Sequence, residues 1–112
     1  MRVQEIVVGG DAITQMHPHT IIDMAAHHRL PTAYPSGEFI DAAGLVAYGV
    51  NYPDLHYRFA SFIDKILKGA KPSDLPIERP VKFELVINTK TAAALKIYIP
   101  QSVPLRANRV IE

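Results

Sequence analysis

Short apolar stretches of strand length alternate along this chain with segments of helical periodicity, and this alternation limits the fold more than any other feature. The strand patterns cover residues 5–10, 32–35, 45–49 and 82–88. The helical patterns cover residues 18–29, 38–43, 53–68 and 91–96, and residues 99–112 show no clear period. Strands that alternate with helices favour an α/β architecture with mostly parallel strand pairing. The 112 residues suffice for one compact domain.

The clearest helix is expected at residues 53–68, where apolar side chains recur along one face. Pro53 suits its first turn, Gly69 suits the position after its last turn, and Pro72 lies just beyond. The polar side chains of this segment fall on the opposite side of the helix. We call the apolar face the apolar stripe, and it consists of Leu55, Phe59, Phe62, Ile63, Ile66 and Leu67.

Charge and residue usage exclude several classes of function. Twelve basic and eleven acidic side chains nearly balance, so no nucleic-acid partner and no membrane-surface binding are expected. The chain has no cysteine, which excludes disulfide frameworks, thiolate metal sites and cysteine nucleophiles. Its apolar runs are far shorter than the roughly 20 residues of a membrane helix. Its first residues lack the apolar core of a signal peptide, so no signal peptide is expected within this chain.

The histidines do not form a familiar metal-binding pattern. His17 and His19 flank a proline, and His27 and His28 are adjacent, so neither pair has the i, i+4 spacing of a helical zinc site. We therefore predict no metal site, and in particular no metal at His17 and His19. Phosphate-binding loops, dinucleotide fingerprints and nucleophile elbows are also missing from the sequence, so no cofactor is expected.

Three carboxylates remain as candidates for a functional site. No nucleophile, paired acid or cofactor motif accompanies Glu38 and Asp41, and we interpret both as solvated loop charges. Asp11 follows the first strand pattern at its carboxyl end, which is where open α/β sheets bind their ligands. The residue pattern by itself therefore predicts an α/β domain with a candidate small-molecule cleft.

Two longer stretches of sequence carry a family resemblance. The first runs from HHRLPTAYP at residues 27–35 to AGLVAYGVN at residues 43–51. The second runs from IDKILKGAKPSDLPIE at residues 63–78 to KFELVIN at residues 82–88, and it combines a helix end, a proline-rich connector and a strand in one order. Together they resemble the substrate-binding proteins of ABC transporters, in the group that includes tryptophan- and phenylalanine-type binding proteins.

The resemblance implies a two-lobed periplasmic-binding-protein fold of type I, the ribose-binding type. Each lobe of that fold is an α/β sheet, and the ligand lies between the lobes. Members of the family are much longer than this chain. We therefore expect residues 1–112 to form a single partial α/β domain from the second lobe, with a mostly parallel sheet and flanking helices. The helix at residues 53–69 is expected to pack on the absent first lobe or on a partner chain.

The resemblance also implies ligand-binding residues. Asp11 falls at a strand end that lines the cleft in the family, and Tyr48, Gly49 and Asn51 fall on the hinge strand and the loop after it. Some amino-acid-binding relatives have aspartate at the position of Asn51, and asparagine pairs less strongly with an ammonium group. The expected partner is a small organic solute, with an amino-acid-like solute as one candidate.

The implied function is solute binding for an ABC-type uptake transporter, without covalent chemistry, so no enzymatic activity is expected. Closure of the two lobes would trap the solute and present the closed form to a membrane permease. The resemblance implies a periplasmic protein or an extracellular lipoprotein. The alternative is a truncated stand-alone fragment that binds no solute and acts only as an oligomerising α/β domain.

The apolar stripe also predicts how the chain assembles. Burying a Leu, Ile or Phe side chain stabilises a protein by about 1.5–3 kcal/mol, so six exposed side chains forfeit on the order of 10 kcal/mol. This amount rivals the total stability of a small domain, about 5–15 kcal/mol. The stripe must therefore pack on the chain's own sheet or on a second copy, and we expect a homodimer or a higher assembly.

Overall fold

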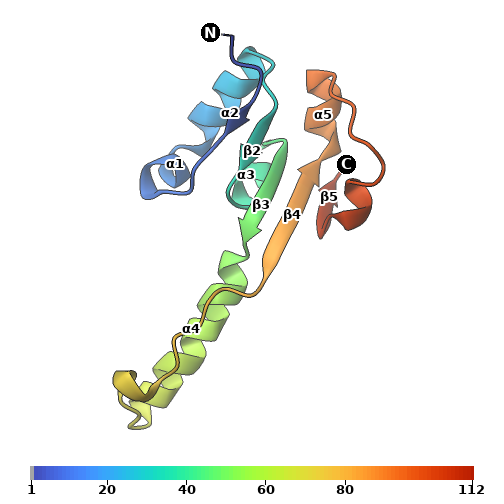
Figure 1. The fold of residues 1–112 in the computed structure, drawn as a ribbon. Helices are drawn as coiled ribbons and strands as arrows, with labels where there is room; N and C mark the ends of the chain where they lie inside the picture. Colours follow the sequence, from blue (N-terminus) through green and yellow to red (C-terminus); the bar gives the residue numbers. More distant parts are fainter. Residues whose placement is uncertain (1) are drawn as a thin grey trace.

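The computed structural model describes residues 2–112 and contains one five-stranded sheet (Figure 1). The spatial order of the strands follows the sequence: β1 (Ile6–Val7), β2 (Thr32–Tyr34), β3 (Val46–Val50), β4 (Phe83–Asn88) and β5 (Arg109–Ile111). The pairs β1–β2, β2–β3 and β4–β5 are parallel, whereas β3 and β4 are antiparallel. The prediction of an α/β fold with a mostly parallel sheet is confirmed.

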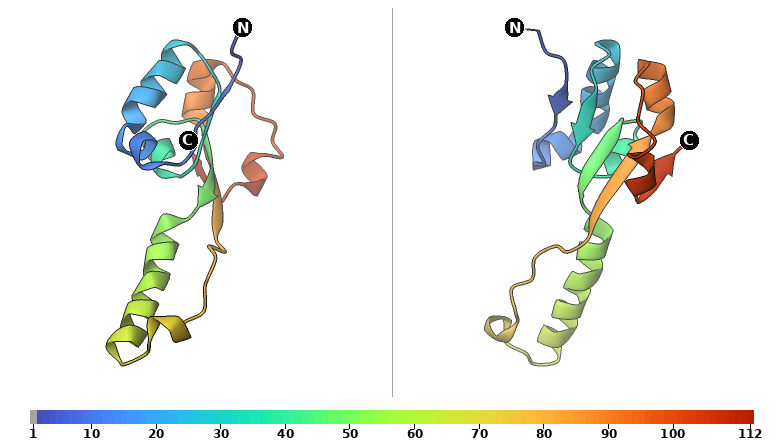
Figure 2. Two further views of the ribbon diagram at one scale, coloured as in Figure 1. Left: turned by 60° about the vertical axis from the view of Figure 1, so that its left-hand side comes forward. Right: turned by 45° about the vertical axis from the view of Figure 1, so that its right-hand side comes forward.

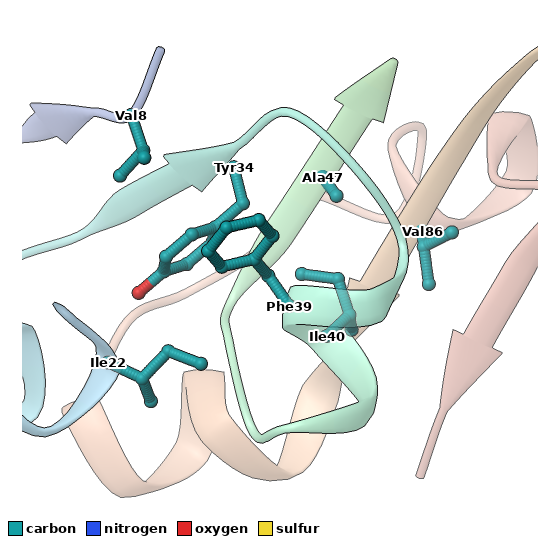
Figure 3. Packing of buried hydrophobic residues seen from close by; sticks show 7 residues of the cluster. All are labelled: Val8, Ile22, Tyr34, Phe39, Ile40, Ala47 and Val86. Carbon is teal, nitrogen blue, oxygen red and sulfur yellow. The ribbon is translucent and has the colours of Figure 1, made fainter. Parts of the chain in front are cut away.

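Helices cover one face of this sheet. The connection from β1 to β2 contains α1 (Ala12–Met16) and α2 (Pro18–His27), the connection from β2 to β3 contains α3 (Glu38–Asp41), and α5 (Thr89–Leu95) follows β4. The left view of Figure 2 shows α1, α2 and α3 on the same side of the sheet. The core lies between these helices and the strands, and its buried cluster consists of Val8, Ile22, Tyr34, Phe39, Ile40, Ala47 and Val86 (Figure 3).

The other face of the sheet carries exposed apolar side chains. Successive side chains of a strand point to opposite faces, so Ala47 points into the core while Tyr48 and its cross-strand partner Leu85 point away from it. Val7 is 79% exposed, Tyr48 66% and Phe83 46%. We call the uncovered part of this side of the sheet the open face, and it is formed by Val7, Tyr48, Phe83 and Leu85. Val46 and Ile87, on the same side, are covered by Ile99 and Val103 of the C-terminal segment.

Between β3 and β4 the chain leaves the sheet as a long arm (Figures 1 and 2). The arm consists of helix α4 (Tyr52–Leu67), the 3-10 turn η1 (Pro72–Asp74) and an extended return to β4. It makes the molecule elongated, with principal extents of 56 × 30 × 23 Å and a radius of gyration of 17.4 Å. A compact domain of this length has a radius of gyration of about 13 Å. The helix α4 therefore takes no part in the core, and none of its residues is buried.

The apolar stripe of α4 is only partly covered by the return segment of the arm. Leu55 and Phe62 are half-buried and line a groove together with Leu75 and Pro76. Ile63, further along the helix, is exposed. Since α4 points away from the sheet in every view, the stripe does not pack on its own sheet, which was one of the two options left open by the sequence (Figures 1 and 2).

Two short elements and one helix cap were not predicted from the sequence. The helix α1 begins with a capping box, in which Asp11 Oδ1 accepts a hydrogen bond from the N–H of Thr14 at 2.9 Å and Thr14 Oγ1 accepts from the N–H of Asp11 at 3.2 Å. The strand β5 has three residues and exists through its pairing with β4. Asn88 caps α5, because its side-chain oxygen Oδ1 accepts a hydrogen bond from the N–H of Thr91 at 3.0 Å.

Candidate functional site

A polar pocket lies at the carboxyl edge of β2 and β3. Because these strands are parallel, the segments that follow them meet at one edge of the sheet, where β4 begins. The pocket has a volume of about 270 Å³. We call it the edge pocket, and its polar lining consists of Ser36, Glu38, Asp41, Asn51, Glu84 and Arg109.

Asn51 joins the arm to the edge pocket. Its side-chain oxygen Oδ1 accepts a hydrogen bond from the N–H of Asp54 at 2.8 Å and so caps α4. Its Nδ2 group donates to Oε1 of Glu84 on the neighbouring strand. Its backbone N–H donates to the carbonyl oxygen of Lys82 at 3.0 Å. The two side-chain bonds fix the orientation of the Asn51 side chain, and the backbone bond holds its main chain at the base of the arm.

The edge pocket carries more negative than positive charge. Arg109 Nη1 lies 2.8 Å from Asp41 Oδ1, and this ion pair balances one carboxylate. Ser36, which is only 3% exposed, donates from its hydroxyl group to Glu38 Oε2 at 3.3 Å. Within residues 2–112, none of the ion pairs includes Glu38 or Glu84. The lining therefore offers two carboxylates without a cationic partner to a solute at this edge.

Glycine at position 49 allows a close approach of two backbone segments at the rim of the pocket. A Cβ atom at Gly49 would lie 1.8 Å from the carbonyl oxygen of Pro35, far inside the contact distance of two atoms. Only glycine lets β3 pack this closely against the loop that carries Ser36. Gly49 therefore has a structural role at the rim, and its assignment as a ligand contact stays a prediction.

The other predicted ligand-binding residues lie outside the lining of the edge pocket. Asp11 follows β1 at the same edge of the sheet, but its carboxylate caps α1. Tyr48 projects from the open face, where its ring stacks on Phe83 with the centroids 6.0 Å apart. Of the four predicted residues, Asn51 alone lines the edge pocket. The assignments of Asp11 and Tyr48, like that of Gly49, stay predictions.

The histidines lie apart from the edge pocket. His17 precedes the first residue of α2 and makes no side-chain cap bond, and the rings of His27 and His28 meet edge to face at 5.0 Å. In the part of the chain that the structure describes, no group of three or more His, Cys, Asp or Glu side chains is arranged to hold a metal ion. The expectation of no metal at His17 and His19 stays a prediction.

Sequence reasoning missed much of the pocket lining. Glu38 and Asp41 are exposed as expected of loop charges, yet both flank the pocket. Glu84 has a signal in the sequence, because it is a charged residue inside an otherwise apolar strand pattern. Arg109 carried none, since its position depends on the pairing of β5 with β4, which no local pattern indicates.

A mostly parallel sheet with a polar pocket at its carboxyl edge is typical of α/β proteins that bind small molecules. The family model for ABC transporter substrate binding proteins matches residues 1–111, and the chain belongs to this family. Proteins of this family are generally not enzymes. A comparison with curated proteins gives no match.

Several solved structures share the fold. An ABC domain from Streptococcus pneumoniae in complex with L-Trp is 30% identical, with a TM-score of 0.90 over 98% of this chain and 37% of that chain. A conserved domain protein from Vibrio cholerae is 23% identical, with a TM-score of 0.89 over 96% of this chain and 36% of that chain. The ligand-free, open structure of a Clostridium difficile substrate binding protein with adhesive properties is 19% identical. Its TM-score is 0.62 over 96% of this chain and 36% of that chain.

The chain spans 36–37% of the length of these solved chains. The sheet and the arm are both part of the match, because the match covers 96–98% of this chain. Among the helices formed by residues 2–112, none is long and apolar enough to cross a membrane.

Proposed function

We propose that this chain forms one wall of the solute-binding cleft of a substrate-binding protein that serves an ABC-type uptake transporter. The observation that carries the proposal is the edge pocket at the carboxyl edge of the sheet, in a chain of this family. Its volume of about 270 Å³ lies just below the range of about 300–1,000 Å³ for small-molecule pockets. Such a size suits one wall of a cleft that a second lobe completes. Binding proceeds without covalent chemistry.

The charge of the edge pocket favours a solute with a cationic group. Among residues 2–112 no ion pair includes Glu38 or Glu84, and an ammonium group forms strong hydrogen bonds with carboxylates. Asn51 stands at the position where some relatives have aspartate, but Glu84 beside it supplies the negative charge there. The complex of the Streptococcus pneumoniae protein with L-Trp also supports an amino-acid-like solute for this chain.

In this proposal residues 1–112 act as one partial domain of a two-lobed protein. Asn51 and Glu84 make the central solute contacts, and Asp11, Tyr48 and Gly49 contribute at the rim of the complete cleft. The helix at residues 53–69 packs on the first lobe or on a partner chain. Closure of the lobes traps the solute, and a membrane permease recognises the closed form. The complete protein works in the periplasm or as an extracellular lipoprotein, where the family normally works.

Isothermal titration calorimetry with a panel of amino acids that includes L-tryptophan tests the solute class. Glu84→Gln removes the carboxylate charge while keeping the shape of the side chain. It should weaken binding of an amino acid by at least about tenfold, which corresponds to about 1.4 kcal/mol. Indole-3-propionate, which lacks the ammonium group of tryptophan, should bind Glu84→Gln as well as it binds the parent chain or better.

Glu78→Gln is the matched control, because Glu78 lies on the arm, where it pairs with Arg58 outside the edge pocket. It should leave the affinity for amino acids unchanged. Amino acids that bind Glu84→Gln and the parent chain equally well would remove Glu84 from the site. A panel in which no amino acid binds would contradict the proposed solute class.

An oligomerising domain without solute binding is the second candidate function, and the exposed apolar stripe of α4 favours it. Ile63 and Leu67 are exposed on this helix although burial would stabilise them. Under either function, we propose that the chain associates with itself as a homodimer. A stable dimer that releases no heat with any solute in the panel would favour this second candidate.

A further inference from the structure

We infer that Arg109 and Glu84 bind the two charged groups of a zwitterionic α-amino acid, with Arg109 on its carboxylate and Glu84 on its ammonium group. The inference rests on the proposed function and deepens it, because it names the chemical class of the solute and the residue that recognises its second charge. Both side chains line the edge pocket. They therefore act from the same wall of the proposed cleft.

Gly37 leaves room between these two side chains. It lies on the edge pocket, in the loop that joins β2 to α3. A Cβ atom at this position would lie 3.3 Å from Nη2 of Arg109 and 3.8 Å from Oε2 of Glu84. These two atoms are thus at most about 7 Å apart, yet within residues 2–112 they form no ion pair with each other. A cation and an anion therefore flank a space that a side chain at position 37 would fill.

Each of the two charged groups is held on one side and free on the other. Arg109 Nη1 donates to Asp41 Oδ1 at 2.8 Å, which is the one side-chain hydrogen bond of this guanidinium group within residues 2–112. Its other nitrogens keep their donors, since a guanidinium group carries five N–H bonds in a planar fork. Glu84 Oε1 accepts from Asn51 Nδ2, whereas Oε2 is the oxygen near Gly37. Both groups are therefore oriented and still able to bind a solute.

This pair of groups matches the chemistry of an α-amino acid. A guanidinium group binds a carboxylate through charge-assisted hydrogen bonds, and a carboxylate binds an ammonium group in the same way, each at about 2.7–2.9 Å. The ammonium and carboxylate groups of an α-amino acid are separated by a single carbon atom, so one solute molecule can contact both side chains across this gap. An amine would leave Arg109 without a solute partner, and a carboxylic acid would leave Glu84 without one. The edge pocket therefore selects a zwitterion over either analogue.

Calorimetry on the complete protein tests the role of Arg109. Each amino acid of the panel is measured beside the amine that lacks its carboxylate, such as tryptamine for L-tryptophan. Arg109→Gln should weaken binding of the amino acid by at least about tenfold, which corresponds to about 1.4 kcal/mol. It should leave binding of the amine unchanged or make it tighter, because it removes a positive charge beside an ammonium group. Arg106→Gln, which changes an exposed arginine of the 3-10 turn η2 (Pro104–Arg106) outside the edge pocket, should alter neither.

Gly37→Ala tests the space between the two groups without changing any charge. The backbone of Gly37 has φ −63° and ψ −23°, a conformation that any residue adopts. The added methyl group should weaken binding of the amino acid several-fold, because it occupies the space between Arg109 and Glu84. Gly9→Ala is the matched control, since a Cβ atom at Gly9 meets no atom within 4 Å. Thermal unfolding of both variants shows that they are folded.

The outcomes separate failure of the inference from failure of the proposed function. An amino acid that binds Arg109→Gln as tightly as it binds the unsubstituted protein overturns the inference alone. Equal weakening of the amino acid and its amine also overturns it, because a purely structural role of Arg109 would affect both solutes alike. A panel in which no amino acid binds the unsubstituted protein contradicts the proposed solute class, and the inference falls with it.

Discussion

Tyr34 is a residue whose ionisation is altered by folding. It lies in the core cluster, and its ring stacks on Phe39 with the centroids 5.1 Å apart. Burial raises the pKa of the Tyr34 hydroxyl above its ordinary value of 10.0, because the ionised form would lose its hydration. The folded chain therefore holds this proton more tightly than the unfolded chain does.

The raised pKa predicts a loss of stability at high pH. The contribution of Tyr34 is fully present below about pH 10 and is lost as the pH rises through the raised pKa of the folded state. Tyr34→Phe keeps the ring and removes the ionisation, so its free energy of unfolding should decline less steeply above about pH 10. Urea denaturation at a series of pH values measures the slope. Tyr98→Phe is the control, because it changes an exposed tyrosine. Its free energy of unfolding should decline with pH as steeply as that of the parent chain. An equally steep decline for Tyr34→Phe would contradict the prediction.

The residues of the edge pocket differ in how far the sequence reveals them. Asn51 stands between a strand pattern and the helix that Pro53 starts, so local pattern and family resemblance together place it at the edge of the sheet. Asp11 occupies the analogous place after β1, but its carboxylate is used by a capping box, which requires only Thr14 three residues later. Arg109 reaches the pocket through strand pairing between distant segments, and residue spacing contains no information on that pairing.

Elements whose apolar periodicity extends over many residues were predictable from the sequence. Elements that form only by pairing with a distant segment were not. The expected helix at residues 53–68 appears as α4 (Tyr52–Leu67), because its apolar periodicity, its proline and its cap all agree. The strand β5 has three residues and the helix α1 has five, and both are too short to show a periodic pattern in the sequence. The direction of the arm was not predictable from the period of α4, because an amphipathic face shows that a helix needs a partner and not where that partner lies.

The end of α5 offers a test at the scale of one element. Lys96 ends this helix in the left-handed conformation, with φ 57° and ψ 39°. That conformation is strained for a residue with a Cβ atom and suits glycine. Lys96→Gly should therefore raise the free energy of unfolding by about 0.5–1 kcal/mol, the difference between the relief of strain and the added entropy of the unfolded chain. Chemical denaturation measures the change.

Lys90→Gly is the matched control for this prediction, because it makes the same substitution inside α5, where the residue is exposed. Glycine in a helix lowers stability by about 0.5–1 kcal/mol. The change in the free energy of unfolding should therefore be positive for Lys96→Gly and negative for Lys90→Gly. A loss of stability in both would show that the conformation of Lys96 is not strained.

At the scale of the whole molecule, the exposed apolar stripe of α4 predicts self-association. Light scattering at micromolar concentration should give a mass of about twice the 12.4 kDa of one chain. Ile63→Glu should shift the chain toward the monomer, because it would bury an unpaired charge in the interface. Ser61→Glu, which adds the same charge on the polar side of α4, should not. A 12.4 kDa species for the unsubstituted chain would contradict the prediction.

The rim of the edge pocket is held in place by main-chain contacts. Gly49 lies against the carbonyl oxygen of Pro35, and the N–H of Asn51 donates to the carbonyl oxygen of Lys82. Charged side chains such as Glu38 project from this frame toward the solvent. Substitutions among them change the charge of the lining while the frame keeps its shape. Under the proposed function, a domain built in this way can acquire new solute preferences during evolution through few mutations and at little cost in folding stability.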